Sequence, residues 1–499
     1  MNNQFDELTK SLAQSVTRRA ALKKFGLGLA SITVACFMPT SKAQVSHLGP
    51  LTELSQPSAL SGCTGIALPG TWGPNDAAEP AIAVNPAQPN NIVVDWILGP
   101  AGDVVSATSL DGGRSWQQVP LPLTTCSGGP FVAAADPWLA FGPDGALYAI
   151  NGMGNSLSAI FIGVNKSTDG GLHWSGITYV TPTPGLGARP TISTDSTDPR
   201  FAYAFWQGSV KSASPQFFSR TTDGGVTWET PYAAYQLAPH YAVDSSQVFV
   251  LPGGSLVYLG LLYYQGPNQP PKQSYIAVMR SSDHGQTWSS LSIAATMLPL
   301  SQPNSSGANL IVDPETGRYV HDAGDPAFAM DPNNGNLYAV WEDGRFSNFQ
   351  INEIAFSMSS DGGLTWSTPI RINQTPRNIP LLNRQAFLPS VAVLADGTIG
   401  VSYYDFRFND ANPGLPTDYW LAQCHPSADK SPTNPASWGN EMRFTDNSFN
   451  LESVTLFPDE YFLGDYVGGL AASGRAFVAA FTAVDQSGIT AIFARRVGP

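Results

Sequence analysis

Four charged residues occupy the same place in four similar stretches of the sequence, each directly before a proline and a short apolar run. They are Glu79, Asp136, Arg189 and Asp325. Carboxylates that are brought close together repel one another, which raises some of their pKa values or recruits a cation. If the four stretches are equivalent in structure, these side chains meet around one axis and form a site for a polar substrate or a cation. The alternative is that they cap repeated turns and bind nothing.

A second group of candidates follows predicted strands, where loops that bind or react are commonly placed. Residues 342–345 read Glu-Asp-Gly-Arg and residues 403–407 read Tyr-Tyr-Asp-Phe-Arg, so both segments carry acids beside an arginine. Arg384 and Tyr466 lie near the starts of neighbouring hairpins. The candidates from this group are Asp343, Arg345, Arg384, Tyr404, Asp405, Arg407 and Tyr466.

A repeated strand hairpin has to position all of these residues. Each hairpin opens with the pattern x-Pro-x-Φ-Ala-Φ, where Φ is apolar, and continues after a turn with a second apolar strand, as in 79–84 and 91–96. Small and β-branched residues suit the crowded innermost strands of a radial assembly. Six hairpins are recognisable, and residues 464–480 form a seventh whose last strand, 490–494, lacks an outer neighbour. We expect a segment near 64–68 to supply that neighbour and close the ring, which removes exposed sheet edges.

A second repeat lies downstream of these hairpins and follows the pattern Ser/Thr-x-Asp-x-Gly-x-x-Trp. Glycine provides the positive φ that a tight reversal needs, the aspartate accepts hydrogen bonds from the turn's own backbone, and the tryptophan packs on the neighbouring turn. We expect these turns on the outer rim with a structural role, rather than as calcium ligands or acids. The five copies begin at Ser109, Ser167, Thr221, Ser281 and Ser359.

The two repeats together predict an all-β fold: a single β-propeller with four-stranded blades around one channel. The hairpin count favours seven blades, with six as the alternative if one hairpin is an insertion. The composition agrees, because 13% charged residues, 48 glycines and 41 prolines are typical of short strands and tight turns rather than helices. We expect residues 44–499 to form this one domain.

Charge and cysteine content restrict the partners. With 38 acidic against 25 basic residues and a formal net charge of −13, the surface repels phosphate backbones and anionic lipids. We therefore expect a monomer with no nucleic-acid partner and, once an N-terminal signal is removed, no membrane contact. Cys63, Cys126 and Cys424 allow one disulfide whose pairing stays open, and their spacing is not that of a metal site. We expect neither a metal nor a cofactor.

Residues 1–43 have the features of an export signal. The pair Arg18 and Arg19 precedes an apolar run over 25–38, and Ser-Lys-Ala at 41–43 supplies a cleavage site of small residues. This pattern predicts a twin-arginine-type signal, which carries folded proteins out of the cytoplasm. We expect the mature protein in the periplasm or outside the cell.

Through its five turns, known as Asp boxes, the stretch 65–499 resembles the sialidase-like (Asp-box or BNR-repeat) β-propeller superfamily. The resemblance implies a carbohydrate-active protein that binds a glycan or glycoconjugate, and more narrowly an exo-α-sialidase-like glycoside hydrolase. Sialidases of this group hold the substrate carboxylate with three arginines and use an aspartate as acid or base and a tyrosine as nucleophile. Where the family has its first arginine, this sequence reads Ala78-Glu79-Pro80.

Carried over residue by residue, the resemblance assigns roles to the candidates. Arginines would clamp a carboxylate, one aspartate would be the acid, and one tyrosine would be the nucleophile. The catalytic set is then Asp136, Asp343, Tyr404 and Tyr466, and the substrate-binding set is Glu79, Arg189, Asp325, Arg345, Arg384, Asp405 and Arg407.

Two other functions fit the same architecture, since a fold does not define an activity. A binding propeller would display loops for a glycan or protein partner, with exposed aromatic residues and no cluster of acids with arginine. A polysaccharide lyase would use loop histidines such as His240 and His321. An enzyme should instead concentrate residues with perturbed pKa values at one end of the channel. The acid–arginine segments at strand ends favour an enzyme.

Overall fold

The computed structural model describes residues 47–498 apart from short gaps, at 64, 66–69, 74, 100, 157–158, 186, 209–212, 236, 265–273, 301–310, 322–323 and 466–467. Ser46–Pro499 forms a unit of its own. The predicted export signal and the candidate nucleophile Tyr466 lie outside the described residues.

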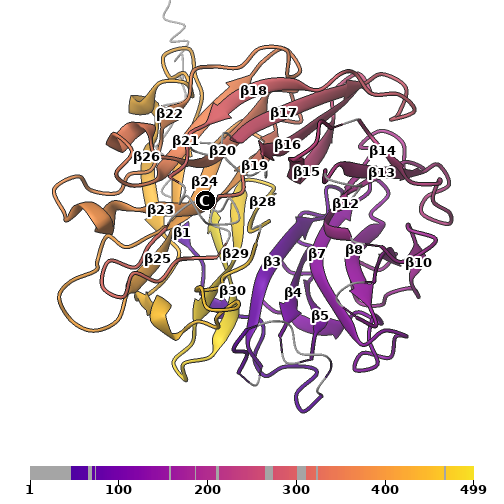
Figure 1. Cartoon of the computed structure of the whole chain (residues 1–499), viewed down its shortest axis with the longest axis horizontal. Coiled ribbons are helices and arrows are strands. Elements are labelled where there is room, and N and C mark those ends of the chain that lie inside the picture. Colours follow the sequence, from indigo (N-terminus) through magenta and orange to yellow (C-terminus); the bar gives the residue numbers. More distant parts are fainter. Residues whose placement is uncertain are drawn as a thin grey trace, which may run out of the picture. The chain divides into compact units, whose positions relative to one another are not determined.

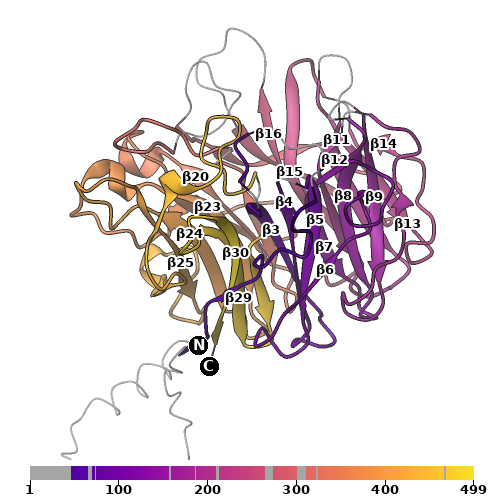
Figure 2. The same ribbon diagram turned by 90° about the horizontal axis from the view of Figure 1, so that it is seen from below.

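Seven antiparallel sheets follow one another along this unit, and the strands of each sheet pair in chain order. In Figure 1 the sheets pass around a ring in the order of the sequence colours, and Figure 2 shows the ring from the side. The protein is therefore a seven-bladed β-propeller, as predicted. We number the blades 1 to 7 from the sheet that begins with β3.

The strands of the first four blades are as follows. Blade 1 consists of β3 (Ala77–Val84), β4 (Ile92–Leu98), β5 (Asp103–Ser109) and β6 (Gln117–Pro120). Blade 2 consists of β7 (Ala133–Phe141), β8 (Leu147–Gly154), β9 (Ile160–Ser167) and β10 (Thr178–Tyr179). Blade 3 consists of β11 (Gly187–Thr194), β12 (Ala202–Gly208), β13 (Gln216–Thr221) and β14 (Tyr232–Ala233). Blade 4 consists of β15 (Tyr241–Val250), β16 (Leu256–Tyr264), β17 (Ser274–Ser281) and β18 (Ser292–Met297).

The remaining blades complete the ring. Blade 5 consists of β19 (Ala327–Met330), β20 (Leu337–Asp343), β21 (Glu353–Ser359) and β22 (Ile370–Arg371). Blade 6 consists of β23 (Ala386–Val393), β24 (Ile399–Asp405), β25 (Pro416–Cys424), β26 (Gly439–Arg443) and β27 (Phe449–Asn450). Blade 7 consists of β28 (Leu470–Ser473), β29 (Ala476–Val484), β30 (Thr490–Gly498), β1 (His47–Leu48) and β2 (Thr52–Glu53).

Helical structure in the described residues is limited to single 3₁₀ turns, and none of it is long and apolar enough to cross a membrane. These turns are η2 (Arg345–Ser347), η3 (Leu381–Arg384), η4 (Pro435–Ser437) and η5 (Leu451–Ser453). Apolar side chains fill the spaces between neighbouring blades. Val93 of blade 1, for example, lies in one buried cluster with Leu139 and Leu147 of blade 2.

Blade 7 is built from both ends of the described chain. His47 pairs with Gly498, and Thr52 pairs with Ala494, so β1 and β2 cover the outer edge of β30. The prediction that an N-terminal segment closes the ring is correct, and segment 47–53 does so; most of the segment 64–68 that was expected there lies outside the described residues. Two-residue strands that are exposed or half-buried carry no alternating pattern, which is why the sequence did not reveal them.

The Asp-box turns join the third and fourth strands of blades 1 to 5, away from the innermost strands. In blade 5, the Ser359 hydroxyl accepts a hydrogen bond from the Gly363 N–H at 2.9 Å, and Asp361 Oδ1 accepts from the Thr365 N–H at 2.9 Å. The Thr365 hydroxyl also donates to Asp361, and these bonds lower the pKa of that carboxyl to about 2. The aspartate is thus an ionised acceptor inside its own turn, which is a structural role.

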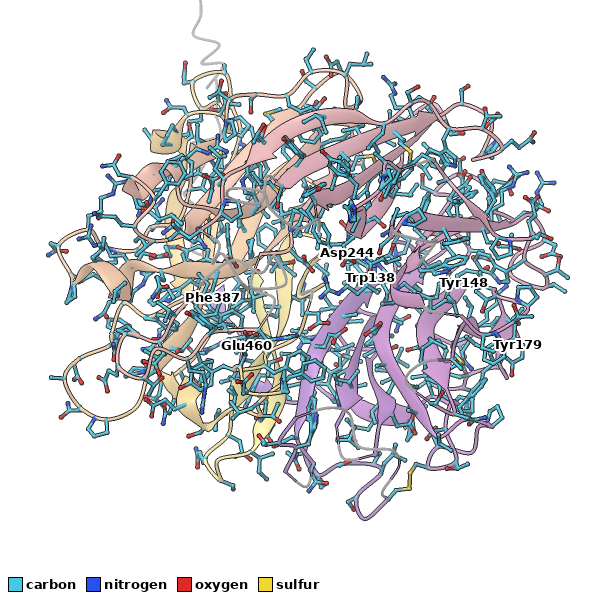
Figure 3. All side chains as sticks on the ribbon, in the orientation of Figure 1. Trp138, Tyr148, Tyr179, Asp244, Phe387 and Glu460 are labelled. Carbon is cyan, nitrogen blue, oxygen red and sulfur yellow. A yellow bond between two sulfur atoms is a disulfide. The ribbon has the colours of Figure 1, made fainter. Side chains whose placement is uncertain are left out.

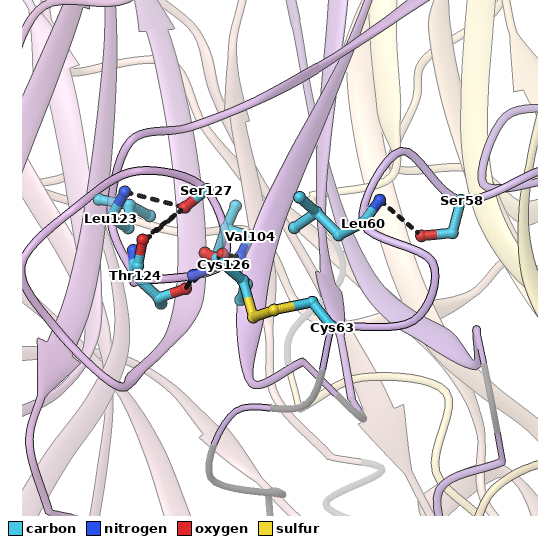
Figure 4. The surroundings of a disulfide bond; sticks show 9 residues. Ser58, Leu60, Cys63, Val104, Leu123, Thr124, Cys126 and Ser127 are labelled. Carbon is cyan, nitrogen blue, oxygen red and sulfur yellow. Dashed lines mark hydrogen bonds between the residues drawn. A yellow bond between two sulfur atoms is a disulfide. The ribbon is translucent and has the colours of Figure 1, made fainter.

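One disulfide joins Cys63 to Cys126, 63 residues apart, and Cys424 is a buried free thiol. The bond links the segment before blade 1 to the loop between β6 and β7 (Figure 4). Hydrogen bonds within that loop hold Cys126 in place, since its N–H donates to the Thr124 hydroxyl at 3.1 Å. The pairing that the sequence left open is therefore decided by the position of this loop.

Reduction of this disulfide should destabilise the ring. A cross-link over a loop of this length typically stabilises a protein by about 2–4 kcal/mol. We expect the double variant Cys63→Ser/Cys126→Ser to unfold at a lower urea concentration than the wild type and to be insensitive to reductant. Cys424→Ala is the control and should keep the full response to reductant. A wild-type urea midpoint that does not move on reduction would contradict this prediction.

Candidate functional site

The innermost strands of five blades contain the same β-bulge, and three of the four pre-proline residues predicted to meet occupy it; the fourth, Asp325, lies just before β19. At each bulge the register between the first and second strands slips, and the first bulge residue has a positive φ although it is not glycine. This conformation costs about 1 kcal/mol or more per residue, and it re-aims the side chain. The five residues are Glu79 (φ 60°), Asp136 (φ 56°), Arg189 (φ 50°), Ser245 (φ 46°) and Leu388 (φ 47°).

The guanidinium of Arg189 gathers carboxylates from three other blades. Its Nη1 lies 2.9 Å from Asp244 Oδ2 and 3.1 Å from Asp325 Oδ2, and its Nη2 lies 3.3 Å from Asp465 Oδ2. Its backbone N–H donates to Asp136 Oδ2 at 2.8 Å. Asp244 is labelled near the centre of the ring in Figure 3. Together with Glu79 these residues form what we call the axial cluster.

The sequence predicted the meeting of four members of the axial cluster, Glu79, Asp136, Arg189 and Asp325. It missed Asp244, because blade 4 has serines where the other units have a proline. The register slip between Asp244 and Gln247 is the same bulge in another sequence, but there Ser245 is the equivalent of Glu79 and Asp244 comes one residue earlier, so equivalence of position does not reveal it. Asp465, which precedes β28, was not among the predicted site residues.

Burial and mutual repulsion decide which acids of the cluster ionise. Burial, followed by the charges of Asp136 and Asp465, raises the pKa of Glu79 well above its ordinary value. Burial also raises the pKa of Asp136 to about 6, against the hydrogen bond from the backbone of Arg189. Of the two acids, Glu79 is thus shifted toward its protonated form by burial and by the charges of Asp136 and Asp465, and Asp136 by burial.

Two cavities meet at the axial cluster. A pocket of about 210 Å³ is lined by Glu79, Asp136 and Asp465 on one side and by apolar side chains such as Phe457 and Phe462 on the other. The central channel is a second cavity of about 400 Å³, and its lining includes residues of the innermost strand of every blade. Arg189 and Asp325 line the channel. Arg189 contacts Asp465 of the pocket directly, and Asp325 is connected to the pocket through Arg189. An elongated polar ligand would thus find acids, an arginine and aromatic rings in one place.

A buried carboxyl supports the bulge of blade 6. Glu342 Oε1 accepts a hydrogen bond from the Leu388 N–H at 2.8 Å, as Asp136 does from Arg189 in blade 3. Burial raises the pKa of Glu342 to about 8. The two interpretations of the pre-proline acids are therefore not exclusive, because Asp136 both caps a turn and lines the pocket.

The candidates Asp343 and Arg345 lie outside the axial cluster. Asp343 is buried and accepts hydrogen bonds from the Trp341 indole at 2.7 Å and the Leu298 N–H at 3.1 Å. Arg345 pairs with it at 2.7 Å and also donates to the Thr296 carbonyl. These contacts tie the end of β20 in blade 5 to the end of β18 in blade 4, so the structure gives both residues a local structural role.

Tyr404 is a correction to the predicted catalytic set. Its side chain is fully buried in the apolar cluster between blades 6 and 7, next to Phe387 and Tyr419. Its hydroxyl donates to the Thr482 carbonyl at 2.9 Å and accepts from the Thr482 N–H at 3.1 Å. Burial raises its pKa well above the ordinary value. A phenol in this environment cannot reach a substrate, so it is not a nucleophile.

The three-arginine clamp is the second correction. Arg407 pairs with Asp405 at 2.7 Å and Glu441 at 2.6 Å, and its guanidinium stacks on Trp420 at 3.6 Å from the ring centroid. Arg384 donates to the Ile379 carbonyl at 3.1 Å. Each of these arginines, like Arg345, is held by partners near its own blade. Among the predicted arginines, only Arg189 lies in the axial cluster, because a position after a strand does not say which way the side chain points.

The described residues contain no group of histidine, cysteine and acidic side chains arranged to hold a metal ion. Within the axial cluster, the ion pairs of Arg189 offset part of the repulsion between the acids.

No protein-family model and no curated protein matches this sequence. The chain is a seven-bladed β-propeller, and similar solved structures include arabinofuranosidases and sialidases. An α-L-arabinofuranosidase from Fusarium graminearum is 15% identical over 72% of this chain and 93% of its own, with a TM-score of 0.46. An intramolecular trans-sialidase from Ruminococcus gnavus is 13% identical over 85% and 94%, with a TM-score of 0.40. A Dyadobacter fermentans protein of unknown function is 13% identical over 87% and 97%, with a TM-score of 0.43.

The raised pKa of Glu342 predicts a pH-dependent stability. Its carboxyl ionises near pH 4.5 in the unfolded chain but near pH 8 when folded, so the folded state binds the extra proton and this group's contribution falls as pH rises between these values. Glu342→Gln keeps an acceptor for the Leu388 N–H and carries no charge. We expect the free energy of unfolding of Glu342→Gln, measured by urea titration, to gain on that of the wild type between pH 5 and pH 8. The difference between the two proteins should grow by more than about 1 kcal/mol over this range.

The control for this experiment is Glu342→Ala, which leaves the Leu388 N–H without its acceptor. It should be less stable than Glu342→Gln at both pH values. If the wild type and Glu342→Gln show parallel stability curves between pH 5 and pH 8, the buried carboxyl does not take up a proton on folding.

Proposed function

We propose that this protein is an exported glycoside hydrolase that acts at the axial cluster. One observation carries the proposal: Glu79 and Asp136 line the same small pocket, and their environments raise their pKa values to different extents. Cleavage of a glycosidic bond needs one carboxylic acid to protonate the leaving oxygen and one carboxylate to act as base or nucleophile. A pair with one proton between them meets both needs at neutral pH.

Glu79 has the properties of the general acid. Its Oε1 is buried and has no hydrogen-bond partner among the described residues, which leaves the proton available to a substrate in the pocket. Asp136 is oriented by the backbone N–H of Arg189 and supplies the carboxylate. Phe457 and Phe462 offer apolar surface to the face of a sugar ring and exclude water from the acids.

The charge around Arg189 indicates a neutral sugar as the substrate. In the sialidase mechanism that the resemblance implied, free arginines bind the substrate carboxylate in bidentate pairs. Here the guanidinium is engaged by Asp244, Asp325 and Asp465, and an anionic sugar would have to displace them while facing their charges. We therefore propose a neutral glycoside as the substrate and include a sialoside in the test below, because exo-α-sialidase-like activity is the alternative.

The other two functions have less support. A polysaccharide lyase was considered because of His240 and His321, but His240 is exposed beside Tyr264, whereas His321 contacts Asp465. A propeller that binds glycans without cleaving them would not need a buried acid pair with separated pKa values.

Release of a fluorescent leaving group tests the proposal. We expect hydrolysis of at least one neutral glycoside in a panel that also contains a sialoside, and a loss of about 100-fold or more in kcat for Glu79→Gln and for Asp136→Asn. Asp361→Asn changes a carboxylate on the rim and is the matched control, which should keep wild-type activity. If only the sialoside is cleaved, the proposal of a neutral substrate is wrong and the substrate is a sialoside. If hydrolysis survives in both Glu79→Gln and Asp136→Asn, the axial cluster is not the catalytic site.

The pH profile gives an independent check. Activity needs Asp136 ionised, so kcat/KM should rise with pH through a midpoint of about 6. If Glu79 is the general acid, kcat/KM should fall again at higher pH as Glu79 loses its proton, since burial raises the pKa of its carboxyl. A profile that is flat between pH 5 and pH 7 would mean that Asp136 is not the essential carboxylate.

A further inference from the structure

Two long connections between blades meet beside the axial cluster. Residues 311–321 belong to the connection from β18 to β19, and residues 455–463 belong to the connection from η5 to β28. Val320 and Tyr461 form a parallel bridge, and the His321 N–H donates to the Tyr461 carbonyl at 2.9 Å. We call the two segments together the cap.

The cap is anchored on both sides. The Gln385 side chain accepts from the Val312 N–H at 2.9 Å and donates to the Val312 carbonyl at 2.7 Å, which fixes the first segment to blade 6. The Thr71 N–H donates to the Leu456 carbonyl at 2.9 Å, which fixes the second segment next to blade 1. The side chains that the cap presents to the pocket are therefore held in place.

The side chain of His321 and the backbone of Leu463 bring the cap into contact with the axial cluster, since the Leu463 carbonyl accepts from the Glu79 N–H at 3.2 Å. His321 Nδ1 lies 2.8 Å from Glu460 Oε2, and its Nε2 lies 3.4 Å from Asp465 Oδ1. Phe457 and Phe462 pack against the ring at centroid distances of 4.9 and 5.6 Å. Only 15% of the side chain is exposed, so water contributes little to its hydrogen bonding. Glu460 is labelled in Figure 3.

Two carboxylates flank the His321 ring, and a neutral imidazole has only one N–H to donate. Its Nδ1 is within hydrogen-bond distance of Glu460, whereas Nε2 lies at ion-pair distance from Asp465. A positive charge on the ring would attract both carboxylates at once. Asp465 in turn faces Arg189 at 3.3 Å, and its charge also acts on Glu79 and Asp136.

We propose that His321 is a positioning residue, held as an imidazolium between Glu460 and Asp465, that fixes Asp465 as an anion beside Arg189. The consequence for catalysis rests on the proposed function. An anionic Asp465 is one of the charges that favour the protonated form of Glu79, so the cap helps to keep the acid loaded. The two segments of the cap thereby influence the charge state of Glu79 on an innermost strand.

Nitrogen NMR of the protein labelled in its six histidines tests the charge without any substrate. The ring signals of His321 are assigned by their loss in His321→Gln. At pH 7 we expect both ring nitrogens of His321 to have imidazolium shifts, and Glu460→Gln to convert the ring to a neutral tautomer. Glu229→Gln removes a carboxylate on the rim and is the control. A neutral ring at pH 7 in the wild type would overturn the proposal.

Activity variants separate charge from packing. With a neutral glycoside as substrate, we expect His321→Gln to lower kcat about tenfold or more with a smaller change in KM, and His321→Lys to recover part of the loss because lysine carries a permanent charge. Equal activity of the two variants would show that only packing matters. Unchanged signals from the rim residues His173 and His284 confirm that each variant is folded.

The failure of this inference differs from the failure of the proposed function. If no glycoside is cleaved but the ring is an imidazolium that depends on Glu460, the hydrolase proposal falls and the positioning of Asp465 stands. If glycosides are cleaved at Glu79 and the ring is neutral, only the role of His321 falls.

Discussion

One guanidinium connects the innermost strands of much of the ring. Arg189 of blade 3 pairs with carboxylates that precede or belong to the innermost strands of blades 4, 5 and 7, and its backbone orients a carboxylate of blade 2. Without this positive charge, the acids at the axis would face one another in a poorly solvated space, where repulsion is strong. The ion pairs of Arg189 are therefore the condition under which so many acids can lie together.

The backbone contributes to the same arrangement. Five non-glycine residues adopt a positive φ at equivalent bulges, although an ordinary strand would avoid this conformation. The bulge turns the pre-proline side chain toward the axis. In two blades the backbone N–H of this residue donates to a carboxylate of the preceding blade: Arg189 donates to Asp136, and Leu388 donates to Glu342. Local strain, turn capping and the placement of charge are thus one structural device, repeated around the ring.

Repetition also explains how much of the structure could be predicted. The hairpins and Asp boxes recur with fixed patterns, so the seven-bladed ring and the convergence of Glu79, Asp136, Arg189 and Asp325 followed from equivalence of position. Tyr404 and Asp343 have no such equivalents. They were selected because they lie at strand ends, and neighbouring residues there point alternately to opposite faces of a sheet. Burial in the interface between blades decides the role of Tyr404, and this is set by side chains distant in the sequence.

The arrangement of the cap and the position of the closing strands could not be predicted, for a different reason. His321, Glu460 and the aromatic residues beside them lie in connections that no other blade shares, so no internal comparison could place them. Strands β1 and β2 are too short to show a period.

The pairing of His47 with Gly498 has a consequence for synthesis on the ribosome. Blades 1 to 6 can form as their strands emerge, since each is contiguous in the sequence, but the last sheet must wait until β30 has been translated. Until then the early segment 47–53 has no partner, and the ring stays open at one seam. Completion of blade 7, which brings Asp465 to the axial cluster, is thus coupled to the synthesis of β30.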